Sequence, residues 1–436
     1  MAISTGVMLF GTTAAAITTT QLIIGGIVFA GASAVVSSVL IPKPSVPSMG
    51  GMGSSGSNLS AKSDPIGNAE IVYGEIRKAG NKVYHETTGN GRYYHFFVTL
   101  AMHEVEEIGD IYINDEIVTI DANGFVTSNG WQSKVFIKKF TGASNQDIYS
   151  DLSSVSNSPT QITSTFKGQG AAVLYVRLFY DANVFKSGIP LITATVKGKK
   201  LYDPRKDSTK SSYDSSLGVS THRDNTPSTW QYSTNPALAI RDYLTSDLGV
   251  ASSQDEIDDD MFAVAANDCA TQSGAFNTGT NSWYNDITVE ENSFEIGGSL
   301  STGNSKMANI NTLIKSLNGT LFWAQGKFKL VAGSYRNPEI SEAFTLDDVR
   351  SSISIQTRFS RRELVNTVRG TFVDKNNRYI AGDFPQLQLA DMSEDNGIES
   401  VIDVDFPLTT KSSSAQRLAK QILYTSREQI TLNAKF

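Results

Sequence analysis

Apolar and polar residues alternate along most of the chain, a pattern typical of half-buried β-strands. Three turn dipeptides interrupt the alternation where hairpins are expected: Asn90-Gly91, Asn114-Asp115 and Gln325-Gly326. The pattern therefore predicts a mainly β chain with α+β segments. The predicted strands are 69–76, 82–88, 93–102, a pair within 109–120, 133–140, 171–180, a strand–turn–strand within 190–205, and 429–436.

The segment from Gly319 to Gly370 begins with the most clearly patterned of these hairpins. A two-residue turn at Gln325-Gly326 directs alternate side chains to one apolar, core-facing side. The segment contains no nucleophile, acid–base pair or metal-ligand set, so we expect an architectural role. The facing pairs are Trp323 with Phe328 and Leu321 with Leu330 on the core side, and Phe322 with Lys329 on the other.

Apolar residues three or four positions apart predict helices in the second half of the chain. One begins at Asn235-Pro236, with proline in its first turn, and another spans 261–270. A small helix and a loop are expected within 141–166. Two further helices have a predicted buried face: 305–317, through Met307, Ile310, Ile314 and Leu317, and 412–424, through Ala415, Leu418, Ala419 and Ile422.

An apolar run from Gln21 to Ile41 has the length of a bilayer-spanning helix. No Lys or Arg precedes Lys43, so the run lacks the positive start of a secretory signal peptide. Three interpretations stay open: a membrane anchor, a helix packed inside an oligomer such as a trimer axis, or a segment held inside a particle and later inserted into a membrane. A stripe of small residues suited to close helix packing consists of Gly26, Ala30, Ala34 and Ser38.

The composition argues against a nucleic-acid-binding surface. The 436 residues carry a formal net charge of −7, whereas such a surface needs clustered Lys and Arg. An acidic lumen repels DNA, which suits a conduit better than a binder. The single cysteine, Cys269, excludes an intrachain disulfide, and its alanine-rich helical surroundings predict a buried apolar role.

The candidate chemistry is sparse. A three-residue loop at Asn90-Gly91 would place His85 opposite His95, and a two-residue loop would place Glu86 there instead, so a metal site depends on register. The acidic run 256–260 lacks the spacing of a calcium loop and is expected to favour a helix N-terminus. No Gly-x-Ser-x-Gly, His-Glu-x-x-His or phosphate-binding motif occurs. We therefore predict no catalytic, metal or cofactor site.

Several blocks of sequence closely resemble one family of viral proteins. They are the segment from Gly319 to Gly370, Val72-Tyr73-Gly74, the stretch from His95 to Glu116, and the block from Pro190 to Arg205. These blocks resemble the tail tip attachment (central tail fibre, baseplate hub) proteins of lambda-like long-tailed bacteriophages. The resemblance covers about residues 66–436 and implies a multi-domain hub of β-barrel-like domains with short helices, following an N-terminal apolar helix.

The resemblance also implies partners. A homotrimer would close the tail tube below the distal tail protein, open for the tape measure protein and DNA, and lead into a fibre that meets the host receptor. DNA would pass through without specific binding, and the run from Gln21 to Ile41 is a possible host-membrane contact. A charged group is expected to form an intersubunit ion-pair network, the alternative being a solvated strand edge: Arg358, Arg361, Arg362, Glu363 and Arg369.

Composition and resemblance together suggest five regions. They are an apolar helix (1–45), a linker (46–65), a first hub β domain with an insertion (66–205), a helical α+β middle domain (206–340) and a second hub β domain (341–436). The runs 69–140 and 340–436 are candidates for two similar barrels in a pseudo-sixfold ring. Rival interpretations are a membrane-anchored bacterial adhesin and a tail-associated peptidoglycan hydrolase. The uncapped last strand suggests a longer polypeptide or a strand completed by a neighbour.

Overall fold

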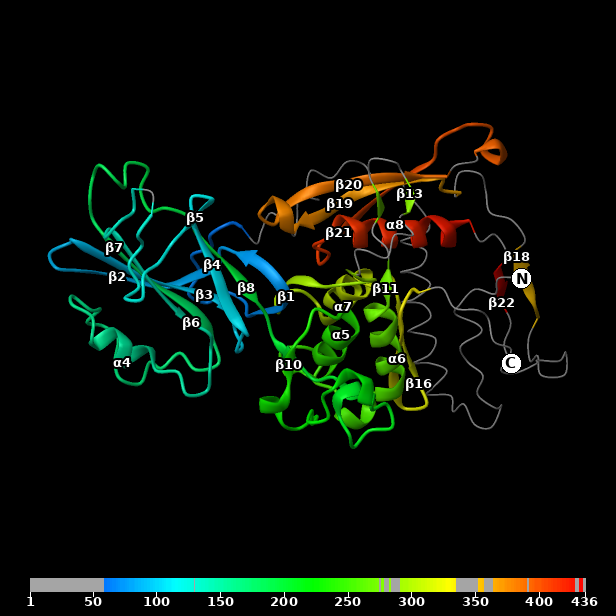
Figure 1. The fold of residues 1–436 in the computed structure, drawn as a ribbon, viewed down its shortest axis with the longest axis horizontal. Coiled ribbons are helices and arrows are strands. Elements are labelled where there is room, and N and C mark those ends of the chain that lie inside the picture. Colours follow the sequence, from blue (N-terminus) through cyan, green and yellow to red (C-terminus); the bar gives the residue numbers. More distant parts are fainter. Residues whose placement is uncertain are drawn as a thin grey trace.

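The computed structural model describes residues 59–128, 130–273, 276–277, 282–283, 291–334, 352–356, 364–389, 392–427 and 431–433. Strand content is 34% and helix content 22%, so the prediction of a mainly β chain is confirmed. Figure 1 shows a β-sandwich beside a helical region that is covered by a C-terminal sheet. The strands of these described ranges form several open sheets and no closed barrel, so the expected barrel shape is not found in them.

Two sheets pack face to face in the first part of the chain. The four-stranded sheet has the order β2–β3–β7–β6 and the five-stranded sheet the order β15–β1–β8–β4–β5. Phe96, Ile111 and Val176 are among the buried side chains between them. The strands of this sandwich are β1 (Glu70–Lys78), β2 (Asn81–Thr88), β3 (Tyr93–Ala101), β4 (Glu107–Ile113), β5 (Glu116–Val118), β6 (Val135–Phe140), β7 (Ala172–Phe179), β8 (Ile192–Lys197) and β15 (Gly297–Ser301).

A short helix and a loop cover the other face of the four-stranded sheet. Helix α4 (Ile148–Ser153) packs Leu152 against Phe97 and its neighbours. The loop that follows is tied to the sheet by Glu86, whose carboxylate accepts hydrogen bonds from Thr160 N (2.9 Å) and Thr160 Oγ1 (2.6 Å). The predicted small helix with a loop is therefore present.

The turn dipeptides set the strand registers. Asn90-Gly91 has φ values of 57° and 79°, as a type I′ turn requires, and Glu86 lies opposite His95. Of the two registers considered, the two-residue loop is the one observed. Asn114-Asp115, with φ values of 47° and 67°, forms the same kind of turn between β4 and β5.

Strand β1 changes partners in the middle of its length. Its first half pairs with β15, ending with Gly74 opposite Gly297, and its second half pairs with β8. Gly74 has φ +60°, and a Cβ at this position would lie 1.7 Å from the carbonyl oxygen of Ile296. The crossing point therefore requires glycine, both for its backbone angle and for the space.

Three helices form the middle of the molecule: α5 (Pro236–Thr245), α6 (Asp259–Ala270) and α7 (Lys306–Lys315). Side-chain oxygens cap their N-termini, Asn235 for α5 and Ser305 for α7. At α6 the cap is Asp258, which accepts from Met261 N at 3.1 Å. The acidic run thus stabilises a helix N-terminus, as predicted.

The predicted buried faces of two helices have different outcomes. In α7, Met307 is 59% exposed, so its assignment to the buried face is wrong. The buried arc centres on Leu313, which is 0% exposed, and Met307 lies about 120° away from it around the helix. In α8 (Ser412–Ser426) the predicted inward residues are all buried: Ala415, Leu418, Ala419 and Ile422.

The hairpin of β16 (Thr320–Ala324) and β17 (Lys327–Val331) has the predicted register throughout. The rings of Trp323 and Phe328 meet edge to face, 4.7 Å between centroids. Leu330 is buried on the core side, and Phe322 on the opposite side is buried as well. The hairpin therefore buries apolar side chains on both of its faces.

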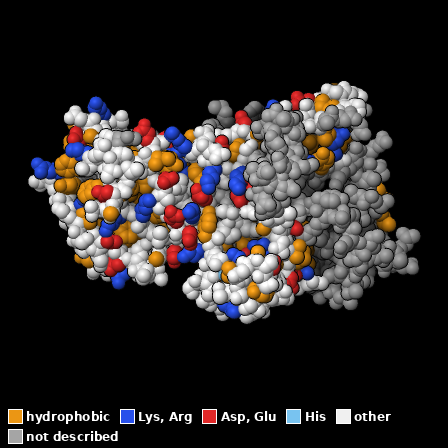
Figure 2. Space-filling view, in the orientation of Figure 1, with side chains coloured by type: hydrophobic (Ala, Val, Ile, Leu, Met, Phe, Trp, Pro, Cys, Tyr) orange, Lys and Arg blue, Asp and Glu red, His pale blue; other side chains and the backbone are white. Residues whose placement is uncertain are grey.

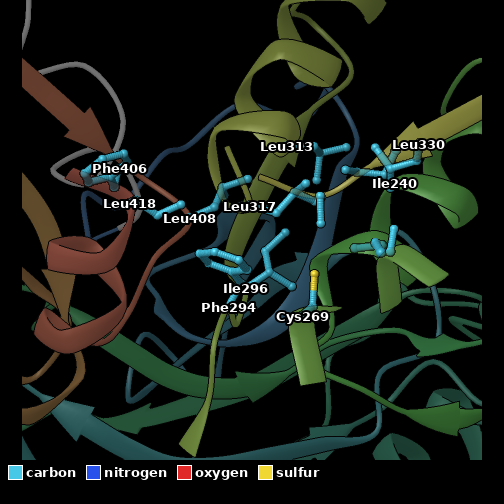
Figure 3. Packing of buried hydrophobic residues seen from close by; sticks show 14 of the residues in the cluster. Ile240, Cys269, Phe294, Ile296, Leu313, Leu317, Leu330, Phe406, Leu408 and Leu418 are labelled. Carbon is cyan, nitrogen blue, oxygen red and sulfur yellow. The ribbon is translucent and has the colours of Figure 1, made fainter. Parts of the chain in front are cut away.

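The C-terminal sheet has the order β20–β19–β21 and comprises β19 (Thr367–Asp374), β20 (Ile380–Gln388) and β21 (Val401–Phe406), with β21 parallel to β19. Helix α8 packs on one face of this sheet (Figure 1). Figure 3 shows Leu418 of α8, Leu313 of α7 and Leu330 of β17 converging in one apolar core. The core thus joins segments on both sides of residue 340. The boundary predicted there, between the middle domain and the second hub domain, stays a prediction.

The remaining described strands form four short pairs: β9 (Lys200–Leu201) with β10 (Gln231–Tyr232), β11 (Gln272–Ser273) with β14 (Glu291–Asn292), β12 (Phe276–Asn277) with β13 (Ser282–Trp283), and β18 (Ser354–Gln356) with β22 (Thr431–Asn433). Among the helices described, none is long and apolar enough to cross a bilayer. The run from Gln21 to Ile41 lies outside the described residues, and with it Gly26, Ala30, Ala34 and Ser38.

Candidate interaction surface and interdomain junction

The C-terminal sheet has a polar outer face, opposite the face that packs on α8. Arg369 of β19 donates from Nε to Asp403 of β21 at 2.6 Å, and Thr371 Oγ1 donates to Asp405 at 2.8 Å. The side chains of Arg369 and Asp403 are 57% and 70% exposed. An ion pair this exposed is screened by solvent, so it is a weak stabiliser of the monomer.

Only one of the predicted subunit-contact residues can be placed. Arg369 lies on this outer face, and its described partner, Asp403, belongs to the same chain. The other four lie outside the described residues: Arg358, Arg361, Arg362 and Glu363. The intersubunit network therefore stays a prediction, for which the exposed outer face offers a surface.

A turn between β19 and β20, residues 374–379, joins the C-terminal sheet to the β-sandwich. Tyr379 is 4% exposed and packs into the sandwich core. Its hydroxyl donates to Glu75 Oε1 at 2.5 Å, and Lys375 Nζ donates to Glu75 Oε2 at 2.9 Å. In Figure 1 the end of the β19–β20 pair lies beside β1, which carries Glu75.

Arg77 extends this junction within β1. Its guanidinium is fully buried, stacks on the Tyr112 ring at 4.0 Å and donates to Thr193 Oγ1 at 2.7 Å. It also donates to Asp115, in the β4–β5 turn, and at 3.4 Å to the carbonyl of Arg378. A buried cation with several partners fixes orientation, because losing one partner leaves a charge unpaired.

The backbone at the end of this turn adopts an uncommon conformation. Arg378 and Tyr379 have φ values of 54° and 61°, in the left-handed region that non-glycine residues seldom occupy. Arg378 also donates from its guanidinium to Asp115 O at 2.8 Å. The contacts with the sandwich therefore hold two successive residues in a conformation that is unfavourable by itself.

The electrostatics of the junction favour a charged Glu75. Burial by itself would raise the pKa of the Glu75 carboxyl, but the hydrogen bonds from Tyr379 and Lys375 outweigh it and hold the pKa below its usual value. Burial and the bond to Glu75 raise the pKa of Tyr379. An open pocket of about 310 Å³ lies alongside, lined by Glu75, Glu107, Gly109, Asp110, Thr195 and Lys197.

Two histidines, His95 and His103, have ordinary structural partners. His95 is buried between Thr88 Oγ1 (2.7 Å) and Tyr175 OH (2.8 Å), and burial lowers its pKa to about 4. His103 Nε2 accepts a hydrogen bond from Val72 N at 2.9 Å. The described part of the chain has no group of three or more His, Cys, Asp or Glu side chains placed to hold a metal ion.

The junction was not among the predicted sites. Glu75 lies about 300 positions before Lys375 and Tyr379, and no local sequence pattern predicts a contact over that separation. The available signal was indirect: an aromatic residue, Tyr379, at the end of the polar turn Lys375-Asn376-Asn377. Figure 2 shows acidic and basic side chains gathered where the sandwich meets the rest of the molecule.

One family of known proteins matches part of the chain. A family described as "Putative phage tail protein" matches residues 306–432, a segment that includes α7, the β16–β17 hairpin, the C-terminal sheet and α8. The search among curated proteins gave no match.

Solved structures extend the likeness along the chain. A chain in the virion of a native gene transfer agent (GTA) particle is similar in fold, with 12% identity and a TM-score of 0.54, over 93% of this chain and 83% of that one. The 43 kDa tail protein of prophage MuSo2 from Shewanella oneidensis aligns at 11% identity over 84% of this chain and 76% of that one, with a TM-score of 0.23. The family match supports a structural protein of a phage tail, and the GTA chain shows a likeness in fold.

Proposed function

We propose that the chain is a baseplate hub, or tail tip, protein of a long-tailed phage. It closes the distal end of the tail tube as a homotrimer, contacts the distal tail protein and other tip proteins, and opens for the tape measure protein and DNA. It leads into a central fibre that meets the host receptor. The observation that carries the proposal is the phage-tail match on residues 306–432, the part of the chain with the hub-like hairpin and C-terminal sheet.

The surface of the described chain suits such an assembly. The outer face of the C-terminal sheet presents charged and hydroxyl groups whose pairing contributes little within one chain, so they are available to a neighbour. The fold likeness to a chain of the GTA virion supports a place among other particle proteins. In the proposed ring, each subunit contributes its sandwich and its C-terminal sheet.

Two measurements test this proposal. Native mass spectrometry of the purified chain should give three times 47.2 kDa, and gold-labelled antibodies should bind only the distal end of the tail in electron micrographs. Labelling along the tube, or at the end next to the capsid, would refute a hub. As a control, an antibody against the major tube protein should label the whole tail.

The rival functions give different results in the same preparation. A trimer that stays soluble without detergent excludes the membrane-anchored adhesin. A peptidoglycan hydrolase would clear a cell-wall gel in zymography, and we expect no clearing. Clearing by the purified chain, lost on heat denaturation, would instead establish a tail-associated hydrolase.

A further inference from the structure

We propose that the 374–379 turn is a releasable latch, which holds the C-terminal sheet against the β-sandwich and lets the two move apart about Gly74. The inference rests on the proposed function, because it supplies the moving part of a hub that opens. Its structural basis is the junction on Glu75 and Arg77, together with the change of partner within β1.

The latch has a deep part and a shallow part. The deep part is the Tyr379 ring, inserted into the sandwich core. The shallow part is the carboxylate of Glu75, which is 25% exposed and receives both Tyr379 OH and Lys375 Nζ. Because the carboxylate borders an open pocket, a cationic group of a neighbouring protein can reach it and compete for these bonds.

The backbone of the turn is strained while Tyr379 is bound in the sandwich core. Arg378 and Tyr379 both hold left-handed backbone angles, which their side chains disfavour. Arg378 also ties the turn to the sandwich, because it donates to Asp115 O at 2.8 Å and its carbonyl accepts from Arg77 at 3.4 Å. Once Tyr379 leaves the core and the bonds to Glu75 and Arg378 break, the turn can relax, which is the property expected of a bistable element and not of an ordinary packed contact.

Gly74 is placed where the movement would occur. It is the last β1 residue paired to β15, and the next residue, Glu75, both pairs with β8 and receives the latch. Breaking the latch thus lets the backbone rotate at Gly74, where β1 passes from pairing with β15 to pairing with β8. Glycine accepts the required range of φ and ψ without steric conflict.

Hydrogen exchange of the purified full chain tests the latch without reference to the phage. The variants are Tyr379→Phe, which removes the donor of the bond, and Glu75→Gln, which removes the charge of its acceptor and leaves a weaker amide oxygen in its place. The matched control is Glu107→Gln, the same change on the same sheet, at a carboxylate whose exposed ion pair with Lys197 joins two strands of the sandwich. The reporting amides include Tyr379 N, which donates to Asp374 O at 2.8 Å.

We expect peptides spanning 373–381 to exchange about tenfold faster in both latch variants, with strands β3 and β7 unchanged and the control like the wild type. Unchanged exchange in both variants would overturn the latch. A uniform increase over the whole chain would overturn it too, because the turn would then belong to one cooperative unit.

Phage particles carrying Tyr379→Phe test the link to opening. They should release DNA on warming faster than Glu107→Gln particles, several-fold at the same temperature. A loosened turn in the purified chain with wild-type release would refute a role in opening. Failure of the hub assignment itself would be seen separately, in the antibody labelling of the tail.

Discussion

Replacing Gly74 by alanine should destabilise the chain far more than the same change at Gly91, although both glycines have positive φ, +60° and +79°. At Gly91 a Cβ meets nothing within 4 Å, so only the backbone penalty applies, about 1–2 kcal/mol. At Gly74 the Cβ would lie 1.7 Å from Ile296 O, closer than any real contact, so the backbone of β1 or β15 must shift.

The shift also disturbs the hydrogen bonds at the crossing point. Gly198 N donates to Gly74 O at 2.7 Å, and losing this bond and one rung of the β1–β15 ladder adds roughly 1 kcal/mol each. The total for Gly74→Ala is then about 3–4 kcal/mol, against about 1–2 kcal/mol for Gly91→Ala. The difference between the two variants isolates the steric part, since both carry the same added methyl group.

Urea unfolding followed by tryptophan fluorescence measures this difference, because the chain has four tryptophans. Far-UV circular dichroism should report the same midpoints if the chain unfolds as one unit. Equal midpoints for Gly74→Ala and Gly91→Ala would refute the reasoning. They would mean that β1 and β15 can separate at Gly74 without lowering the free energy of unfolding.

Further predictions concern single side chains. Glu86→Gln should lower the free energy of unfolding at pH 7 by about 1.5–3 kcal/mol and make loop 155–166 more sensitive to proteolysis. Hydrogen bonds from Thr160 and Tyr84 outweigh burial and lower the pKa of Glu86 to about 2. The advantage of the wild type over the variant should therefore be full above pH 4.5 and vanish as the pH falls towards 2. Leu418→Ala should lower the free energy of unfolding in urea by about 2–5 kcal/mol, because Leu418 is fully buried. Met307→Ala, at an exposed side chain, should change the free energy of unfolding by less than about 0.5 kcal/mol. Arg369→Ala should leave the urea midpoint of the monomer nearly unchanged but raise the trimer dissociation constant in sedimentation; an unchanged constant would remove Arg369 from the interface. Burial raises the pKa of the Cys269 thiol to about 12, so a thiol reagent at pH 8 should react only after unfolding, and rapid native labelling would contradict that burial.

The sequence predicted local structure well where the chain signals it locally. Asn90-Gly91 and Gln325-Gly326 require left-handed backbone angles, and those angles determine the register of each hairpin. Asn235 and Asp258 marked helix starts because side-chain oxygens satisfy free backbone amides there. These signals act within a few residues.

The sequence was less informative where partners are distant or faces are ambiguous. Met307 matched the helical period but lies outside the buried arc, whose position depends on what packs against α7. The bond between Tyr379 and Glu75 joins residues about 300 positions apart, and a single sequence carries no sign of it. Of the candidate site, only Arg369 could be compared with the structure.

The divided pairing of β1 also sets an order of assembly on the ribosome. The sandwich half of β1 finds its partner once β8 has emerged, but the half containing Ile71 and Tyr73 waits for β15. That wait lasts about a hundred residues of synthesis, on the order of 5–20 s at ~5–20 residues per second. During this interval an apolar strand edge is open to wrong partners, so nascent chains of this protein should depend on chaperones most strongly just before β15 appears.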